Sequence, residues 1–377
     1  MKKIIIFIVT GLLLASCNPK GNKSFRPGET WLANDSLNIN AHGGGILFYN
    51  NTYYFFGQFM VEGDAGNRAQ VGVSCYSSKD LYNWKNEGIA LKVVDDTTSD
   101  IRKDCVLERP KVIYNAKTKR FVMWFHLELK WKGYSAARSG VAVADNVTGP
   151  YTYLHSERPD SGFWPVNISK TQKTTKNKCA GVVFHGGSVP EHPDSMNIFG
   201  RDFEGGQTAR DMNLLVDDDG KAYHIYTSEE NSTLHISLLS DDYLSHAGKY
   251  ARAFIGRFME GAAMFKCRGK YYMIASGCTG WGPNAARSAV ADSIFGPWKE
   301  LGNPCVDADS AFTYHSQSTF ILPVQGKEHA FIYMGDRWTP ENAIACKHVW
   351  LPIDFENGRI ILHWLPEWDL SYFKRKD

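Results

Sequence analysis

Five polar side chains occupy equivalent positions in the sequence, each at the start of a short apolar segment. They are His42, Glu108, Asp211, Glu260 and Gln317. One acidic residue at a strand end is usually a solvated charge, but three at the same structural phase would converge in space. Converging carboxylates repel one another and titrate as a coupled group. Because this arrangement is unfavourable unless it is used, we interpret the set as a candidate catalytic site.

Glycoside hydrolysis is the chemistry that such a group suits. One carboxylic acid protonates the leaving oxygen, while a second group directs a water molecule or attacks the sugar. The chain also contains 11 Trp and 18 Tyr residues. Aromatic rings present flat apolar faces that pack against sugar rings as well as they pack in a core. The residue types therefore favour a carbohydrate-active protein.

A repeated hairpin carries these side chains. Each copy is a short apolar strand, a turn and an aromatic-rich strand, as a β-hairpin requires. The copies are "GGILFYNNTYYFFG", "PKVIYNAKTKRFVMWFH", "MNLLVDDDGKAYHIYTS", "AAMFKCRGKYYMIASG" and "STFILPVQGKEHAFIYMG". Related third strands follow two of them, since residues 140–154 and 287–301 align without gaps and share seven of fifteen positions. Residues 74–84 occupy the same place in the first copy.

Five such units predict an all-β fold, a five-bladed β-propeller in which the starts of the first strands meet at one mouth of the axis. A β-sandwich built from the same hairpins is the alternative. The first strands are separated by 66, 102, 49 and 57 residues, so one unit carries a large insertion. We place this insertion at about residues 151–209 and the whole propeller domain at residues 31–377. Long loops in compact domains are usually functional or mobile.

Composition limits the partners. The 42 basic and 40 acidic residues give a net charge of +2 and are evenly spread, so no long-range field attracts polyanions, and nucleic acid is not an expected partner. We expect no metal and no other cofactor. The acidic run "DDDG" at residues 217–220 lacks the continuation of a calcium-binding loop, and we interpret it as a hairpin turn.

The N-terminus has the features of an export signal. Two lysines precede an apolar stretch that is too short to span a membrane, and "LLASC" resembles a bacterial lipobox. Residues 1–17 are therefore expected to be a lipoprotein signal peptide with Cys17 as the lipidated residue, and residues 18–30 a polar tether. A plain secretory signal is the alternative. Because Asn18 follows the cysteine, we expect the outer membrane, on its periplasmic or surface face.

Seven cysteines remain after Cys17, an odd number, so at least one thiol must stay unpaired in an oxidising compartment. Their wide spacing gives no C-x-x-C metal or redox signature. We expect most of them to be small buried hydrophobic residues.

Several motifs in a fixed order resemble glycoside hydrolase family 43, and specifically its exo-β-1,3-galactanase subgroup. They are "AHGGGILFYNNTYYFFG", "LERPKVIYN", "ARDMNLLVDDDGKAYHIYTSEEN", "SGCTGWGPN" and "MGDRW". The resemblance extends from about Ala41 to Trp368, apart from the insertion. Family 43 enzymes usually carry an aspartate base at the head of the first blade, whereas the galactanase subgroup resembles "AHGGG". The glycines there are expected to leave room for a sugar.

The resemblance implies roles for the polar set. Glu260 matches the general acid, and Asp211 matches the aspartate that orients the acid and raises its pKa. Glu108 matches the glutamate that binds the sugar in the −1 subsite, and Gln317 matches a glutamine that positions water in place of a base. An amide is a poor base, so Glu108 acting through a water and His42, with its suitable unperturbed pKa, remain alternatives for that role.

The resemblance also implies substrate contacts. They are His42, Asn231, Thr279 and Trp281, the last by stacking on a pyranose face. Where related sequences have a glutamate, this chain has Gln58, which can still hydrogen-bond hydroxyl groups but brings no charge.

The expected protein is thus an exo-acting, inverting hydrolase that releases galactose from β-1,3-galactan. The expected partner is a polysaccharide or oligosaccharide, the membrane contact is through a lipid anchor only, and the expected state is monomeric. Another family 43 activity, such as an arabinofuranosidase or a galactosidase, is one alternative. A non-catalytic glycan-binding propeller is another, because the usual base is missing.

Overall fold

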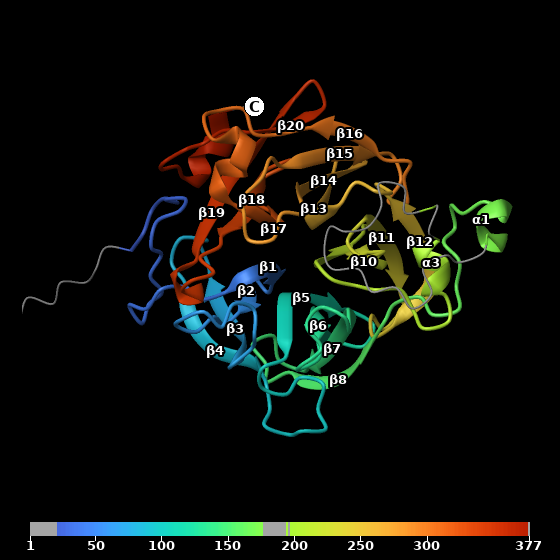
Figure 1. Ribbon diagram of the computed structural model, residues 1–377. Coiled ribbons are helices and arrows are strands. Elements are labelled where there is room, and N and C mark those ends of the chain that lie inside the picture. The colour runs from blue at the N-terminus through green and yellow to red at the C-terminus, as the bar shows by residue number, and fades with distance from the viewer. Residues whose placement is uncertain (1–20, 176–193, 195–196, 376–377) are drawn as a thin grey trace, which may run out of the picture.

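Five four-stranded antiparallel sheets surround a central axis in the computed structural model, which describes residues 21–175, 194 and 197–375 (Figure 1). In each sheet the strands follow one another in chain order. The first blade contains β1 (His42–Tyr49), β2 (Thr52–Gln58), β3 (Gly72–Ser78) and β4 (Lys85–Lys92). The second contains β5 (Val106–Asn115), β6 (Arg120–Glu128), β7 (Arg138–Ala144) and β8 (Thr152–Glu157).

The remaining three blades repeat this order. The third contains β9 (Met212–Val216), β10 (Ala222–Ser228), β11 (Thr233–Leu239) and β12 (His246–Ala253). The fourth contains β13 (Met259–Cys267), β14 (Lys270–Gly277), β15 (Arg287–Ala291) and β16 (Lys299–Gly302). The fifth contains β17 (Gln317–Pro323), β18 (Phe331–Arg337), β19 (Lys347–Glu356) and β20 (Arg359–Leu362). The short helices are α1 (Lys170–Thr174), α3 (Ile198–Arg201), η1 (Ser310–His315), η2 (Ala343–Ala345) and η3 (Leu370–Arg375).

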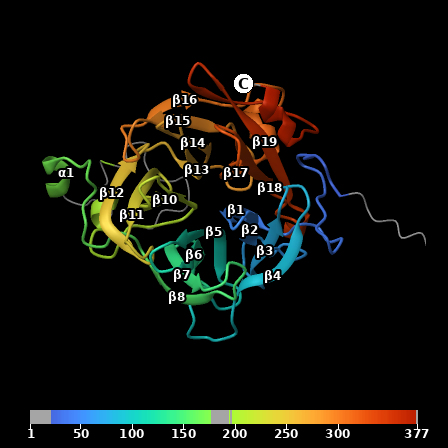
Figure 2. The same cartoon turned by 180° about the vertical axis from the view of Figure 1, so that it is seen from behind.

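The predicted propeller is confirmed, and the sandwich alternative is wrong. Each hairpin identified in the sequence forms the two innermost strands of a blade. The innermost strands form a closed ring, because β1 contacts β5 and β17, β9 contacts β5 and β13, and β13 contacts β17. Figure 2 shows the same ring from behind. The "DDDG" run is a hairpin turn, in which the amide of Asp217 donates to the carbonyl of Lys221.

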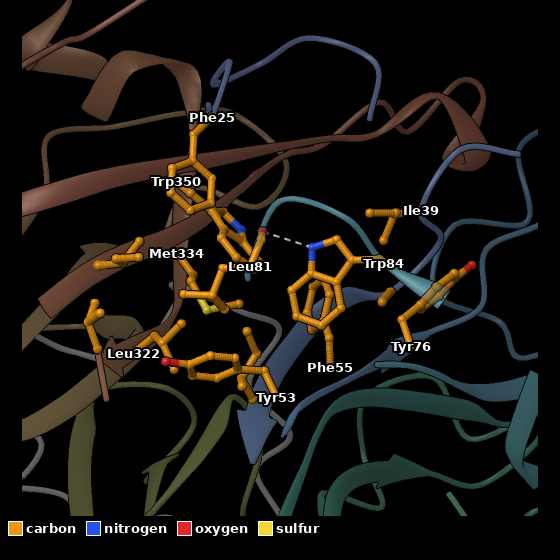
Figure 3. Packing of buried hydrophobic residues seen from close by; sticks show 14 of the residues in the cluster. Phe25, Ile39, Tyr53, Phe55, Tyr76, Leu81, Trp84, Leu322, Met334 and Trp350 are labelled. Carbon is orange, nitrogen blue, oxygen red and sulfur yellow. Dashed lines mark hydrogen bonds between the residues drawn. The ribbon is translucent and has the colours of Figure 1, made fainter. Parts of the chain in front are cut away.

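Hydrophobic clusters lie between neighbouring blades. The alternating apolar side chains of each sheet pack against those of the next, and Phe56 of blade 1 and Val112 of blade 2, for example, belong to one buried cluster. The contact between blades 1 and 5 also closes the ring, and it is rich in tryptophan (Figure 3). Trp84 and Trp350 approach edge to face there, with ring centroids 6.1 Å apart.

Two sequence-based boundaries differ from the structure. Residues 21–30, assigned to the tether, pack on the propeller, because Phe25 is only 2% exposed and its ring stacks on Trp368 with centroids 4.4 Å apart. The insertion begins after residue 157, since β8 completes the second blade. An aromatic residue in an otherwise polar segment was the available signal for the first difference.

The N-terminal predictions lie largely outside the described residues. The signal peptide and Cys17 are among them, as is Cys179. The six cysteines that the structure describes are unpaired, and all are buried except the half-buried Cys278. Among the described residues, no helix combines the length and apolarity needed to cross a membrane.

Candidate active site

A pocket of about 230 Å³ lies where the inner strands of all five blades begin. Each blade contributes side chains to it. The lining residues are Gln58, Asn67, Glu108, Arg109, Tyr134, Asp211, Glu260, Gly280, Trp281, Gln317 and Trp338. The structure therefore brings together four residues of the polar set and two of the expected substrate contacts. His42, Asn231 and Thr279 do not line the pocket.

Backbone irregularities turn the site residues toward the axis. The pairing register shifts beside them in four inner strands, after His42, Glu108, Glu260 and Ser318. Such bulges bend a strand and re-aim side chains, and they are common next to active sites. The residue that follows three of the site positions has a positive φ, with values of 61° at Gly43, 51° at Arg109 and 59° at Gly261.

The glycines of "HGGG" serve packing rather than an open space for sugar. A Cβ at Gly44 would overlap the carbonyl oxygen of Phe56 on the neighbouring strand, and a Cβ at Gly45 would lie 2.5 Å from the Lys111 side chain. None of the three glycines lines the pocket. The expectation that they make room for the substrate is therefore not supported, and their role is to let β1 approach β2 of its own blade and β5 of the next blade closely.

Glu260 has the properties of a general acid at neutral pH. Burial first, and then the nearby charge of Asp211, raise the pKa of its carboxyl group to about 7, although Cys278 and Arg109 oppose the shift. Its Oε1 accepts hydrogen bonds from Asn231 Nδ2 at 3.1 Å and from Cys278 Sγ at 3.2 Å. A pKa close to the working pH is what proton donation in a transition state requires.

Asp211 is held rigidly beside the acid. Its Oδ1 accepts from Arg109 Nε at 2.8 Å, and its Oδ2 accepts from the backbone amide of Gly261 at 2.9 Å. The Asp211 carboxylate is therefore bonded to the backbone of the residue that directly follows Glu260. This geometry agrees with the role that the resemblance implied, an anion that orients the acid and keeps it protonated.

Gln317 is fixed through both ends of its amide. Its Oε1 accepts from Arg109 Nη2 at 2.6 Å and from Trp338 Nε1 at 2.9 Å, while its Nε2 donates to Ser276 Oγ at 2.9 Å. Both lone pairs of the amide oxygen are thereby occupied, and one N–H remains available. In this arrangement the side chain can donate to a water molecule but cannot accept its proton.

Arg109 connects two of these groups and was not predicted from the sequence. Burial alone would lower the pKa of its guanidinium group, but Asp211 and other carboxylates keep the pKa raised. The same side chain contacts Asp211, Gln317 and the carbonyl of Ser318. The signal available in the sequence was its place beside Glu108 in "LERPK".

Glu108 is tied to a buried cation. His126 Nδ1 lies 2.6 Å from Glu108 Oε2, and His126 Nε2 lies 3.0 Å from Glu128 Oε1. Burial disfavours charge on this imidazole, but the two glutamates, Glu108 foremost, raise the pKa of His126 to about 9. Tyr134 OH donates to the other oxygen of Glu108 at 2.6 Å. Glu108 is thus a positioned acceptor that faces the pocket.

His42 lies behind the pocket wall. Its ring is fully buried and stacks on His348 with centroids 4.8 Å apart, and Asp336 Oδ1 is 3.9 Å from its Nδ1. Burial lowers the pKa of His42. The bulge after His42 turns the strand so that the ring enters the contact between blades 1 and 5. Its predicted substrate contact and its candidacy as a base are not supported by this position.

The same three side chains are the candidate metal ligands among the described residues. Ligand atoms of His42, Asp336 and His348 lie within 4.8 Å of one another. However, both oxygens of Asp336 already accept hydrogen bonds, one from the Gly43 amide at 2.6 Å, while the other lies 2.8 Å from His348 Nδ1. The cluster is therefore satisfied as a hydrogen-bonded group, except at the ring nitrogens of His42.

The other expected substrate contacts have separate places. Trp281 is 39% exposed, lines the pocket and meets Trp338 edge to face at 5.7 Å. Gln58 also lines the pocket. Thr279 is exposed, but its hydroxyl donates to the carbonyl of Gly282 within its own loop. Asn231 contacts Glu260 rather than the pocket.

Comparisons with known proteins agree with this geometry. A model of glycosyl hydrolases family 43 matches residues 160–338. A solved family 43 β-1,3-galactosidase with galactodeoxynojirimycin is 47% identical, with a TM-score of 0.87, over 92% of this chain and 100% of its own. No curated protein sequence matches the chain significantly.

Two solved exo-β-1,3-galactanases are also similar. The Phanerochaete chrysosporium enzyme with β-1,3-galactotriose is 30% identical with a TM-score of 0.73, over 93% of this chain and 68% of its own. The Clostridium thermocellum enzyme is 35% identical with a TM-score of 0.74, over 91% of this chain and 66% of its own. The chain thus spans about two thirds of the length of these two relatives.

Proposed function

The chain belongs to glycoside hydrolase family 43, and from that premise we propose that it releases galactose from the non-reducing end of β-1,3-linked galactan. The main support for this proposal is that Glu260, which can be protonated at neutral pH, lies in a pocket to which all five blades contribute side chains. A volume of about 230 Å³ is below that of sites for drug-sized ligands. A space of this size accommodates one sugar unit at a chain end.

The general acid in this proposal is Glu260. Protonated below about pH 7, it donates to the oxygen that leaves with the rest of the polysaccharide. Asp211 keeps the acid protonated and is itself held by Arg109. A general acid typically contributes 10²–10⁴-fold in rate.

The water is positioned rather than deprotonated by Gln317. The remaining N–H of its amide can donate to a water oxygen and fix the direction of attack, because Arg109, Trp338 and Ser276 leave the amide no freedom to turn. Glu108 accepts hydrogen bonds from sugar hydroxyls, with His126 and Tyr134 holding its orientation. The water attacks the face opposite the acid while the bond to the protonated leaving oxygen breaks, which inverts the anomeric centre. The added water then loses its extra proton to the surrounding solvent.

A direct test is incubation of the purified protein with linear β-1,3-galactan, followed by sizing of the products. Galactose as the sole early product, first formed as the α-anomer by NMR, is expected. Release of larger oligosaccharides, cleavage of arabinan or xylan only, or a first-formed β-anomer would contradict the proposal. Binding of galactan without any turnover would favour a glycan-binding propeller.

We also propose that the protein is an exported lipoprotein of the outer membrane, on its periplasmic or surface face, attached through Cys17. The lipobox-like "LLASC" supports this, and packing of Phe25 on the propeller would hold the domain close to the membrane. A Cys17→Ala variant should be recovered in the soluble fraction, whereas the parent should fractionate with membranes. Recovery of both in the same fraction would contradict an anchor. We expect a monomer without nucleic-acid partners.

A further inference from the structure

The segment between blades 2 and 3 packs against blade 3. In Figure 1, α3 lies beside β12 at the periphery of that blade. Phe199 of α3 is buried, and the guanidinium group of Arg252 on β12 lies 4.2 Å from the centre of its ring. Trp164 stacks on Phe203 within the segment at 4.3 Å. The described parts of the insertion are therefore fixed to the propeller by aromatic and cationic contacts.

The turn between β10 and β11 has an unusual backbone. Three consecutive residues adopt left-handed conformations, with φ of 49° at Glu229, 58° at Glu230 and 67° at Asn231. A left-handed conformation is unfavourable for each residue that carries a Cβ. A run of such residues persists only where the surroundings determine it, and such strain is concentrated at functional sites. Here the turn ends on a residue that contacts the acid.

The first residue of the turn is clamped from inside blade 3. Glu229 is fully buried and accepts from Arg252 Nε at 2.6 Å and Nη2 at 2.7 Å, while His235 Nε2 lies 2.9 Å away. Burial would raise the pKa of Glu229, but Arg252 and His235 lower it to about 2. The carboxylate therefore stays charged and paired at any working pH.

The second residue is clamped by the insertion. Glu230 Oε1 accepts from Arg201 Nη2 at 2.8 Å, and Oε2 accepts from Arg210 Nη2 at 2.9 Å. Arg201, the last residue of α3, also forms a two-pronged pair with Asp202 at 2.6 Å for each contact. Two-pronged contacts of this kind fix direction as well as distance. Arg201 thus joins the insertion to the strained turn.

The third residue transmits this placement to the catalytic carboxyl group. Asn231 Oδ1 accepts from Arg210 Nη1 at 3.3 Å, which leaves its Nδ2 to donate to Glu260 Oε1. Cys278 is the second donor to the same oxygen. Because a carboxyl oxygen that accepts two hydrogen bonds is not the one that carries the proton, the acidic proton of Glu260 is directed to Oε2.

We propose that helix α3 belongs to the catalytic apparatus: Arg201, through Glu230 and the left-handed turn, holds the amide of Asn231 on Oε1 of Glu260 and thereby assigns the transferable proton to Oε2. Arg201 and Glu230 are positioning residues, since neither lines the pocket. This inference rests on the proposed role of Glu260 as the acid.

The test compares two substrates that differ in their need for the acid. Arg201→Met removes the clamp but keeps the length of the side chain, and Arg201→Lys restores one donor. On β-1,3-galactobiose, whose leaving group requires protonation, kcat of Arg201→Met should fall at least about tenfold. On 4-nitrophenyl β-galactoside, which needs little protonation, kcat should stay within about threefold. Arg201→Lys should recover part of the loss.

A pH profile adds a readout that general loosening of the fold would not produce. Loss of the Asn231 donor removes a hydrogen bond that favours the charged carboxylate, so the pKa of Glu260 should rise. The alkaline limb of kcat/KM should accordingly move to higher pH in Arg201→Met. Arg257→Met is the matched control, because Arg257 makes a similar two-pronged pair with Glu300 on an exposed edge of blade 4. It should change neither readout.

Results that contradict the role of Arg201 can be told apart from results that contradict the proposed function. Equal losses on both substrates with an unmoved pH limb would overturn the proposal and leave Arg201 a structural residue. If Arg201→Met does not fold, Glu230→Gln, which keeps the shape of the turn, is measured in its place against the same criteria. If the wild type cleaves neither substrate, the proposed function fails, and NMR titration of carboxyl-labelled Glu260 in wild type and Arg201→Met then decides this inference by itself: an unchanged pKa overturns it.

Discussion

The closure between blades 1 and 5 and the axial pocket occupy neighbouring parts of one ring, but different kinds of interaction stabilise them. The closure is a dry cluster in which four aromatic side chains are at most 6% exposed, namely Phe25, Trp84, Trp350 and Trp368. The pocket is a set of charges and amides whose contacts are nearly all directional. The burial of apolar area is non-directional, whereas a charge removed from water must find partners of defined geometry.

This difference separates stability from chemistry. Substitutions in the closure should lower the free energy of unfolding and leave the rate of the folded enzyme unchanged. Substitutions in the pocket should change the rate and its pH dependence with little loss of stability, since burying a charge such as that of Glu260 is itself unfavourable. Each region can therefore be tested with a measurement to which the other should not respond.

The largest effect is expected from Glu260→Gln. It removes the proton donor, so kcat on β-1,3-galactobiose should fall about 10²–10⁴-fold, with a smaller loss on an activated aryl galactoside. The stability of the folded protein, unlike its activity, should not fall. The folded state raises the pKa of Glu260 from 4.5 to about 7, so the ionised form destabilises the fold above pH 7. The melting temperature of the variant at pH 8 should not decrease, and a clear decrease there would contradict the proposed separation.

Trp350→Ala should produce the converse result. Trp350 contacts Phe25, Trp31, Phe55 and Trp84 across the closure, and deletion of a buried tryptophan typically costs about 3–5 kcal/mol. Denaturant unfolding should show this loss, while kcat per folded molecule at low temperature should equal that of the wild type. A proportional loss of kcat in the folded protein would show that the closure and the pocket are coupled.

The same contrast explains what the sequence could predict. The closure and the blades depend on apolar periodicity and turn residues, which are local, so the hairpins were visible in the sequence. The starts of the inner strands then pointed to Glu108, Asp211, Glu260 and Gln317. The packing of residues 21–30 on the propeller was not predicted, because it depends on one aromatic residue, Phe25, in a polar segment. Phe25 is buried by stacking on Trp368, which lies far away in the sequence.

The contacts around the site were not predictable because they join residues that are far apart in the sequence. Arg109 bridges residues about 100 and 200 positions away, and Asn231 and Cys278 reach Glu260 from different turns. His42 had a suitable side chain at a suitable position, but the bulge beside it reverses where the ring points. The direction of a side chain after an irregular backbone step does not follow from a period of two residues.

A smaller effect is expected from Asp211→Asn, and it depends on pH. Removing this charge eliminates the repulsion that helps to raise the pKa of Glu260, and it leaves Arg109 to stabilise the ionised acid. The pKa of the acid should fall, so the alkaline limb of kcat/KM should move to lower pH. Above pH 7 the loss should be about tenfold for each unit of displacement, and it should be smaller at pH 5. An unmoved limb would show that Asp211 acts on the acid only through its orientation.

The smallest effect, and the finest probe of the comparison, is expected from Cys278→Ala. Burial and the neighbouring carboxylate raise the pKa of this thiol to about 12, so it remains a hydrogen-bond donor to Glu260. Removing the donor should raise the pKa of Glu260 and move the alkaline limb slightly upward, with a change in kcat of no more than a few fold, whereas Cys278→Ser, which keeps a donor, should not move it upward.

Cys75→Ala is the matched control in the hydrophobic region. This cysteine is fully buried between blades 1 and 2, so its loss should lower the free energy of unfolding by about 1 kcal/mol and leave the pH profile unchanged. The two thiols have the same chemistry and differ only in their surroundings. In a dry cluster a thiol contributes buried apolar area, whereas beside a carboxyl group it contributes a directional hydrogen bond. The donor role of Cys278 would therefore be contradicted if the Cys75 variant moved the alkaline limb, or if the Cys278 variant changed only the stability.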